Sequence, residues 1–183
     1  ISLAERQLHA LRDKIGQLEQ KLSELIRFGE ENDDISDKVH RLSLALVEAG
    51  SFDGVRHALA SSLQEDFSVP HIALQVWDGA ANEGDGNGNG NAAPVGEAAR
   101  RYFAGLRHAY CGAPDNIEVL SWFGEAAPHV RSVALIPLRH RDETIGVLAL
   151  GSAESERFYP EMGTLYLGRI GDLAAAALKC VSA

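Results

Sequence analysis

The sequence predicts an α+β domain preceded by a long N-terminal coiled-coil helix. This prediction rests on three observations: a heptad pattern of aliphatic residues near the start, two apolar runs joined by a polar turn, and a long amphipathic stretch at the end. The apolar runs, residues 133–138 and 145–150, are continuous rather than alternating, so we expect an antiparallel β-hairpin that is covered on both faces. A chain of 183 residues has room for one domain and an extension.

The heptad pattern predicts a parallel homodimer. Its a and d positions form a seam of six residues, namely Leu8, Leu11, Ile15, Leu18, Leu22 and Leu25. The outward positions are mostly polar or small, whereas a helix that packs on its own domain usually shows a wider apolar stripe. We therefore favour self-association over intramolecular packing and assign residues 1–34 to a dimerisation helix. Gly16 costs roughly 1 kcal/mol relative to Ala in a helix, so we expect other contacts to support the dimer.

A second apolar stripe follows the polar segment 28–34 in a shifted phase, which locally changes the winding of a coiled coil. Residues 42–47 are apolar on nearly all sides, so we expect them to touch both a partner helix and their own domain. The dimer interface is accordingly predicted to continue through Ile35, Val39, Leu42 and Leu46. Gly50 is the expected end of this helix, and residues 35–183 are assigned to the domain.

The remaining elements follow from periodicity and from capping residues. A short helix capped by Asp53 is expected to bury Val55, Leu59 and Leu63, and a strand follows over residues 72–76. We expect a helix over 97–106 that buries Ala98, Tyr102 and Leu106, a short strand over 109–111, and a helix over 114–123 with Ile117 and Leu120 inward. A final helix starting near Pro160 is expected to turn Leu165 inward and to pack against the 35–49 helix.

Residues 79–94 are predicted to be a mobile low-complexity loop, because glycine and asparagine bury too little apolar area to order the chain. The alternating glycines at 84, 86, 88 and 90 lack the lysine and the fixed frame of a phosphate-binding loop, so a phosphate site is disfavoured here.

Composition bounds the function. The net charge is −9, with 26 acidic residues against 17 basic ones, which disfavours nucleic acid and anionic membrane as partners. No apolar run approaches the ~20 residues needed to span a bilayer. The two cysteines are expected to be reduced, which indicates a cytoplasmic protein. The chain starts with Ile rather than Met, so we expect it to belong to a longer protein.

Few residues are candidates for a catalytic, metal-binding or ligand-binding role. Cys111 precedes a glycine and follows Arg107 and His108, which could lower its pKa, but a buried structural thiol is the favoured interpretation. The seven histidines form no metal-type pair, so no metal site is predicted. Arg131, at the mouth of a predicted strand, could bind a ligand carboxylate or phosphate or pair with a surface acid, and both interpretations stay open.

Two stretches resemble the GAF superfamily, namely the glycine-apolar strand 146–152 and the segment 157–160 with the helix after it. Residues 2–7, 31–33, 40–42, 111–112, 131–138 and 151–164 together resemble an uncharacterised proteobacterial GAF-like family, domain-of-unknown-function family 484. The resemblance implies a pocket between one sheet face and its covering helices. Its expected lining is Tyr110, Cys111, Trp122, Phe123, Arg131, Ser132, Ser152 and Phe158. The family has no established activity, so the resemblance supplies the fold but no chemistry, and any cofactor stays unknown. Some GAF proteins reduce methionine sulfoxide, but they need several cysteines, and Cys180 is a poor partner for Cys111.

These observations predict a dimeric cytoplasmic sensory or regulatory module that binds a small ligand and relays its presence through the helices, rather than an enzyme. The alternative is a structural adaptor dimer that recruits a protein partner. A Cys111-dependent redox enzyme is the third hypothesis.

Overall fold

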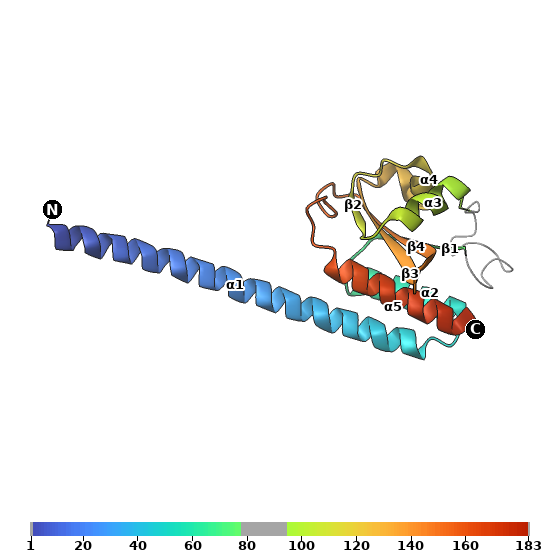
Figure 1. Cartoon of the computed structure of the whole chain (residues 1–183), viewed down its shortest axis with the longest axis horizontal. Helices are drawn as coiled ribbons and strands as arrows, with labels where there is room; N and C mark the ends of the chain where they lie inside the picture. The colour runs from blue at the N-terminus through green and yellow to red at the C-terminus, as the bar shows by residue number, and fades with distance from the viewer. Residues whose placement is uncertain (1, 78–94, 183) are drawn as a thin grey trace. The chain divides into compact units, whose positions relative to one another are not determined.

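The computed structural model describes residues 2–77 and 95–182 (Figure 1). The predicted mobile loop at 79–94 lies outside these residues. The chain divides into two compact units, Ile1–Asp37 and Lys38–Ala183. The first unit is helical and belongs to helix α1 (Leu3–Glu48), and the second holds the end of α1 and all the other elements.

The second unit is built on a four-stranded antiparallel sheet of order β1-β4-β3-β2. The strands are β1 (His71–Val76), β2 (Tyr110–Gly112), β3 (Ser132–His140) and β4 (Glu143–Ser152). Strands β3 and β4 form the predicted hairpin, and Arg141 in its turn adopts a φ of 56°. The predicted α+β class is therefore confirmed.

Helices cover both faces of the sheet (Figure 1). Helices α2 (Phe52–Glu65) and α5 (Leu165–Ser182) lie on one face, while α3 (Glu97–Gly105), α4 (Ile117–Ser121) and the 3-10 helix η2 (Gly124–His129) lie on the other. Each face has its own apolar cluster, with Leu148 and Ile170 in the first and Phe103 and Trp122 in the second. This double cover explains why the apolar runs of β3 and β4 are continuous.

Two local predictions near the second cluster are wrong. Helix α3 buries Ala99 and Phe103 rather than Ala98 and Tyr102, because the Phe103 ring packs between Trp77 and Trp122, with centroids 6.3 and 5.9 Å away. The helix predicted over 114–123 is confined to α4, where Val119 is buried and Ile117 is 84% exposed.

The caps of α2 and α5 also differ from prediction. Ser51, not Asp53, caps α2, and its Oγ accepts a hydrogen bond from the Gly54 amide at 3.1 Å. Val55, Leu59 and Leu63 are buried, as predicted. Helix α5 begins at Leu165, which is exposed, and not near Pro160.

Helix α5 packs mainly on β3 and α2. It lies so close to β3 that a Cβ at Gly171 would stand 2.6 Å from Ile136 Cγ2. The 35–49 helix, expected to be its main neighbour, contributes Leu42 and Leu46 to the same apolar cluster.

Within the second unit, the end of α1 is part of the domain. Leu42 and Leu46 are 0% and 5% exposed in the domain core, and Val39 packs against that core. Arg41 Nη2 lies 2.8 Å from Asp66 Oδ1, which adds an ion pair. Leu42 and Leu46 thus pack within their own domain, as expected, and their predicted part in a dimer interface stays a prediction. Ile35, in the first unit, is half-buried.

Candidate functional site

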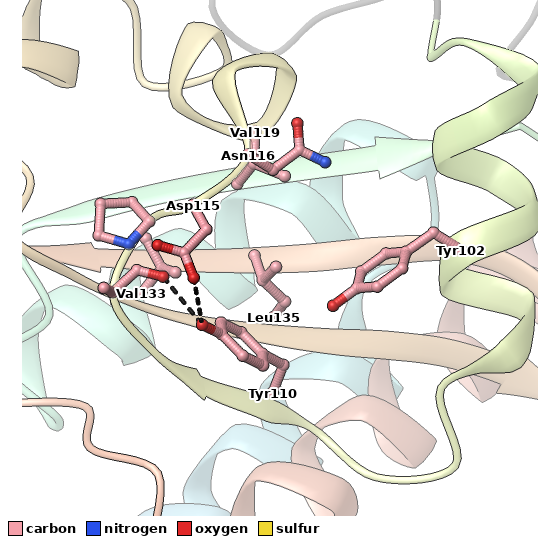
Figure 2. A pocket seen from close by; sticks show the side chains of 9 residues that line it. Tyr102, Tyr110, Asp115, Asn116, Val119, Val133 and Leu135 are labelled. Atoms are coloured by element: carbon pink, nitrogen blue, oxygen red, sulfur yellow. Dashed lines mark hydrogen bonds between the residues drawn. The ribbon is translucent and has the colours of Figure 1, made fainter.

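A hollow of about 100 Å³ opens on the sheet face covered by α3 and α4 (Figure 2). Its floor is apolar and consists of Val133 and Leu135 from β3 and Val119 from α4. Its rim comes from α3, β2 and the segment before α4. The polar side chains of the rim are Tyr102, Tyr110, Asp115 and Asn116, and Ala113 and Pro114 complete it.

The segment from β2 to α4 is fixed by side chains at both of its ends. The Tyr110 hydroxyl donates to the Ala113 carbonyl at 3.0 Å and lies 3.5 Å from Asp115 Oδ2. At the other end, Asn116 Oδ1 accepts from the Glu118 amide at 2.9 Å and so caps α4. Gly112 leaves room for the Tyr110 side chain, because a Cβ there would lie 3.0 Å from the Tyr110 oxygen. Its φ of 156° also favours glycine at this position.

The rim combines hydrogen-bond donors with a carboxylate. Burial, and secondly the charge of Asp115, raise the pKa of the Tyr110 phenol above 10.0, so the phenol remains a protonated donor at neutral pH. Figure 2 shows Tyr110 and Asp115 meeting at one end of the hollow, with Tyr102 at the other. Within the part of the chain that the structure describes, no Lys or Arg lines it. The hollow therefore suits a small molecule that presents N–H or O–H groups to Asp115.

The structure does not bring the eight predicted ligand-binding residues together. Tyr110, Trp122 and Phe123 lie with the α3–α4 face of the sheet, whereas Cys111 and Phe158 belong to the cluster on the α2–α5 face. Successive residues of a strand point to opposite faces, so Tyr110 and Cys111 cannot line one pocket. Of the eight, Tyr110 alone lines the hollow.

The other predicted residues have structural environments. Trp122 and Phe123 are buried in the core. Ser132 Oγ donates to the Glu154 carbonyl at 2.6 Å and accepts from the Phe158 amide at 3.4 Å. These bonds hold the loop after β4 against the sheet.

Two further predicted residues lie beside that loop. Ser152 Oγ accepts from the Glu154 amide at 3.2 Å, and the Ser152 carbonyl accepts from the Arg131 amide at 2.7 Å. The Arg131 residue is exposed and does not line the hollow. Ser132 and Ser152 therefore anchor the backbone of this loop.

Cys111 is buried, and desolvation raises the pKa of its thiol. A raised pKa keeps the thiol protonated at neutral pH, which opposes nucleophilic reactivity. Cys180 is exposed, and both cysteines are free. Residues 2–77 and 95–182 contain no group of three His, Cys, Asp or Glu side chains arranged to hold a metal ion. Over the same residues, no helix is long and apolar enough to cross a bilayer.

Sequence reasoning missed three residues of the rim, namely Tyr102, Asp115 and Asn116. Asn116 carries a recognisable signal, since it precedes Ile117 and Glu118 as an asparagine N-cap precedes an acidic first turn. The same signal points to Asp115, which is the residue next to this cap. Tyr102 was predicted to face the core, but the inward position of α3 belongs to Phe103.

The family described as "Protein of unknown function, DUF484" has a model that matches residues 1–180. This chain belongs to the DUF484 family. The match confirms the resemblance found from the sequence, and the family's description names no activity. No curated protein is significantly similar in sequence to this DUF484 chain.

Solved structures resemble the DUF484 chain in fold. One is the free methionine-R-sulfoxide reductase from Neisseria meningitidis in complex with its substrate, with a TM-score of 0.55 and 14% identity over 80% of this chain and 89% of that one. Another is the GAF domain of A. aeolicus nlh2 in an inactive state, with a TM-score of 0.55 and 14% identity over 81% of this chain and 97% of that one. At such identities the comparison shows the fold alone, and the fold is GAF-like.

Proposed function

We propose that this DUF484 chain is a sensory or regulatory module whose hollow beneath α3 and α4 binds a small polar molecule. The observation that carries the proposal is the Tyr110–Asp115 pair, which sets hydrogen-bonding groups beside an apolar floor. A volume of about 100 Å³ is below the ~300 Å³ at which pockets for drug-sized molecules begin, so the ligand is compact. The Neisseria reductase supports the proposal, because it holds a substrate on the same fold.

The module is proposed to be a cytoplasmic parallel homodimer that does not act as an enzyme. The six seam side chains of α1 are each 50 to 67% exposed, and apolar side chains at heptad spacing are buried by pairing with another helix. The buried, protonated thiol of Cys111 supports a role without thiol chemistry.

Thermal unfolding in the presence of metabolite pools tests ligand binding. A ligand at 100 times its Kd adds about 2.7 kcal/mol to the free energy of unfolding. We expect one pool to raise the Tm of the wild-type protein and of Asp142→Asn, a matched change in the exposed β3–β4 turn, but not of Asp115→Asn. The proposal fails if no pool raises the wild-type Tm, or if Asp115→Asn responds as the control does.

A second candidate function is a structural adaptor that recruits a protein partner. The small volume of the hollow favours it, because an adaptor requires no bound ligand. Pull-down from lysate separates the two functions. An adaptor loses its partners when Ile15 and Leu18 become charged and keeps them in Asp115→Asn.

A further inference from the structure

We infer that a second hollow, at the edge of the sheet beside α5, binds a small molecule carrying two anionic groups, as phosphates or carboxylates. Its volume is about 270 Å³. Its walls come from the segment before β2, from β3 and from the start of α5. It lies apart from the Tyr110–Asp115 hollow, with which it shares no lining residue, so it does not depend on the proposed function.

Pro137 accounts for the opening. Strand β2 pairs with β3 only from Tyr110 to Gly112, opposite Leu135 to Val133. If the register continued, His108 would stand opposite Pro137, which has no amide hydrogen to donate to the ladder. The pairing ends before that point. Arg107, His108 and Pro137 then line the hollow instead of forming a strand pair.

The hollow gathers positive charge in an acidic protein. Arg107, Arg139 and Arg169 line it from three different segments, together with His108, and Asp172 is the one acidic residue among the described residues of the lining. The chain as a whole carries a net charge of −9, so three guanidinium groups around one opening run against its composition. Three cations against one carboxylate leave an excess of positive charge that matches a dianion.

The guanidinium groups are not neutralised by neighbours. Among the described residues, none of the three forms an ion pair with a carboxylate. Arg139 Nη1 donates to the Leu106 carbonyl at 3.2 Å, and the Arg169 guanidinium lies 5.3 Å from the centre of the Tyr166 ring. Both contacts orient a guanidinium without cancelling its charge. Their planar forks fit carboxylate and phosphate oxygens in a bidentate manner.

The start of α5 adds to the positive charge around the hollow. Thr164 and Leu165 line the hollow, and the Thr164 carbonyl accepts the Gly168 amide at 2.9 Å, which places the first helical turn at the opening. The first amides of a helix lack intrahelical partners and carry a partial positive charge that favours anions. The hollow thus places three arginines and the first turn of α5 around a space large enough for a compact ligand.

Titration of the full chain by calorimetry, with inorganic pyrophosphate in one arm and succinate in the other, tests this inference. Chloride keeps the ionic strength equal throughout. We expect saturable binding, and at least tenfold weaker binding in Arg107→Gln and Arg169→Gln, because each substitution removes a charged hydrogen-bond donor to the anion. Arg101→Gln, an exposed arginine of α3 outside this hollow, is the matched control and should bind like the wild-type protein.

The arms identify the anionic group, since tighter binding of pyrophosphate indicates a phosphate ligand and tighter binding of succinate a carboxylate ligand. Circular dichroism confirms that each variant folds. The inference is overturned if neither probe binds above the chloride-matched buffer, or if Arg107→Gln and Arg169→Gln bind as tightly as Arg101→Gln. Loss of metabolite binding in Asp115→Asn leaves this result unchanged, so failure of the proposed function is separable.

Discussion

The double substitution Ile15→Glu/Leu18→Glu should separate the proposed dimer into monomers. Full burial of an aliphatic side chain contributes about 1.5–3 kcal/mol, and these two are each 54% exposed, so pairing contributes about 1 kcal/mol at each position. Two positions in two chains amount to about 4 kcal/mol, which corresponds to roughly a thousandfold rise in the dimer Kd. Four carboxylates brought together on one seam oppose pairing further.

Sedimentation equilibrium over a range of protein concentrations measures this effect. Gln17→Glu/Gln20→Glu is the matched control, because it adds the same charge at outward heptad positions and should leave the Kd nearly unchanged. Far-UV circular dichroism reports whether α1 stays helical. If the seam variant and the control have the same Kd as the wild-type protein, the seam is not the dimer interface.

Three further predictions concern the domain. Ser132→Ala should lower the free energy of unfolding by about 1–3 kcal/mol in urea titration, because it leaves buried backbone groups unpaired. Ser121 is the control, since its exposed hydroxyl also donates to a carbonyl at 2.6 Å, and Ser121→Ala should change the free energy of unfolding by less than about 0.5 kcal/mol. Gly171→Ala should destabilise by about 1–3 kcal/mol through overpacking, while Gly168→Ala, with open space around it on the same helix, should stabilise by up to about 1 kcal/mol; equal effects would contradict the close packing of α5. The raised pKa of the Cys111 thiol contributes stability that is present below the ordinary thiol value of 9.0 and is lost as the pH rises through the folded value. The free energy of unfolding of Cys111→Ala should therefore depend less steeply on pH above 9 than that of the wild-type protein. An unchanged slope would refute this.

The sheet and most of the helices could be predicted from the sequence, because their patterns are long and periodic. The apolar runs of β3 and β4 indicated a covered hairpin, and Val55, Leu59 and Leu63 indicated the buried face of α2. Which residues of a helix face inward was harder to predict. The inward face of α3 depends on Phe103 fitting between two tryptophan rings, a tertiary contact that local spacing does not encode.

The candidate site was harder to predict than the fold. Tyr110 was identified, but Cys111 was placed beside it although neighbouring strand residues face opposite sides of the sheet. Asp115 lies in a short connection, where no periodicity reports which way a side chain points. The arginine hollow was also missed, because its residues come from three distant segments that only the fold brings together.

Electron density in the Tyr110–Asp115 hollow, from crystals of protein purified without added ligands, tests the central claim most directly. A sensory module should show a bound compact molecule in contact with Asp115, or acquire one after soaking with the metabolite pool that raises its Tm. A hollow closed by the protein's own side chains in every crystal, before and after soaking, would contradict ligand sensing at this site.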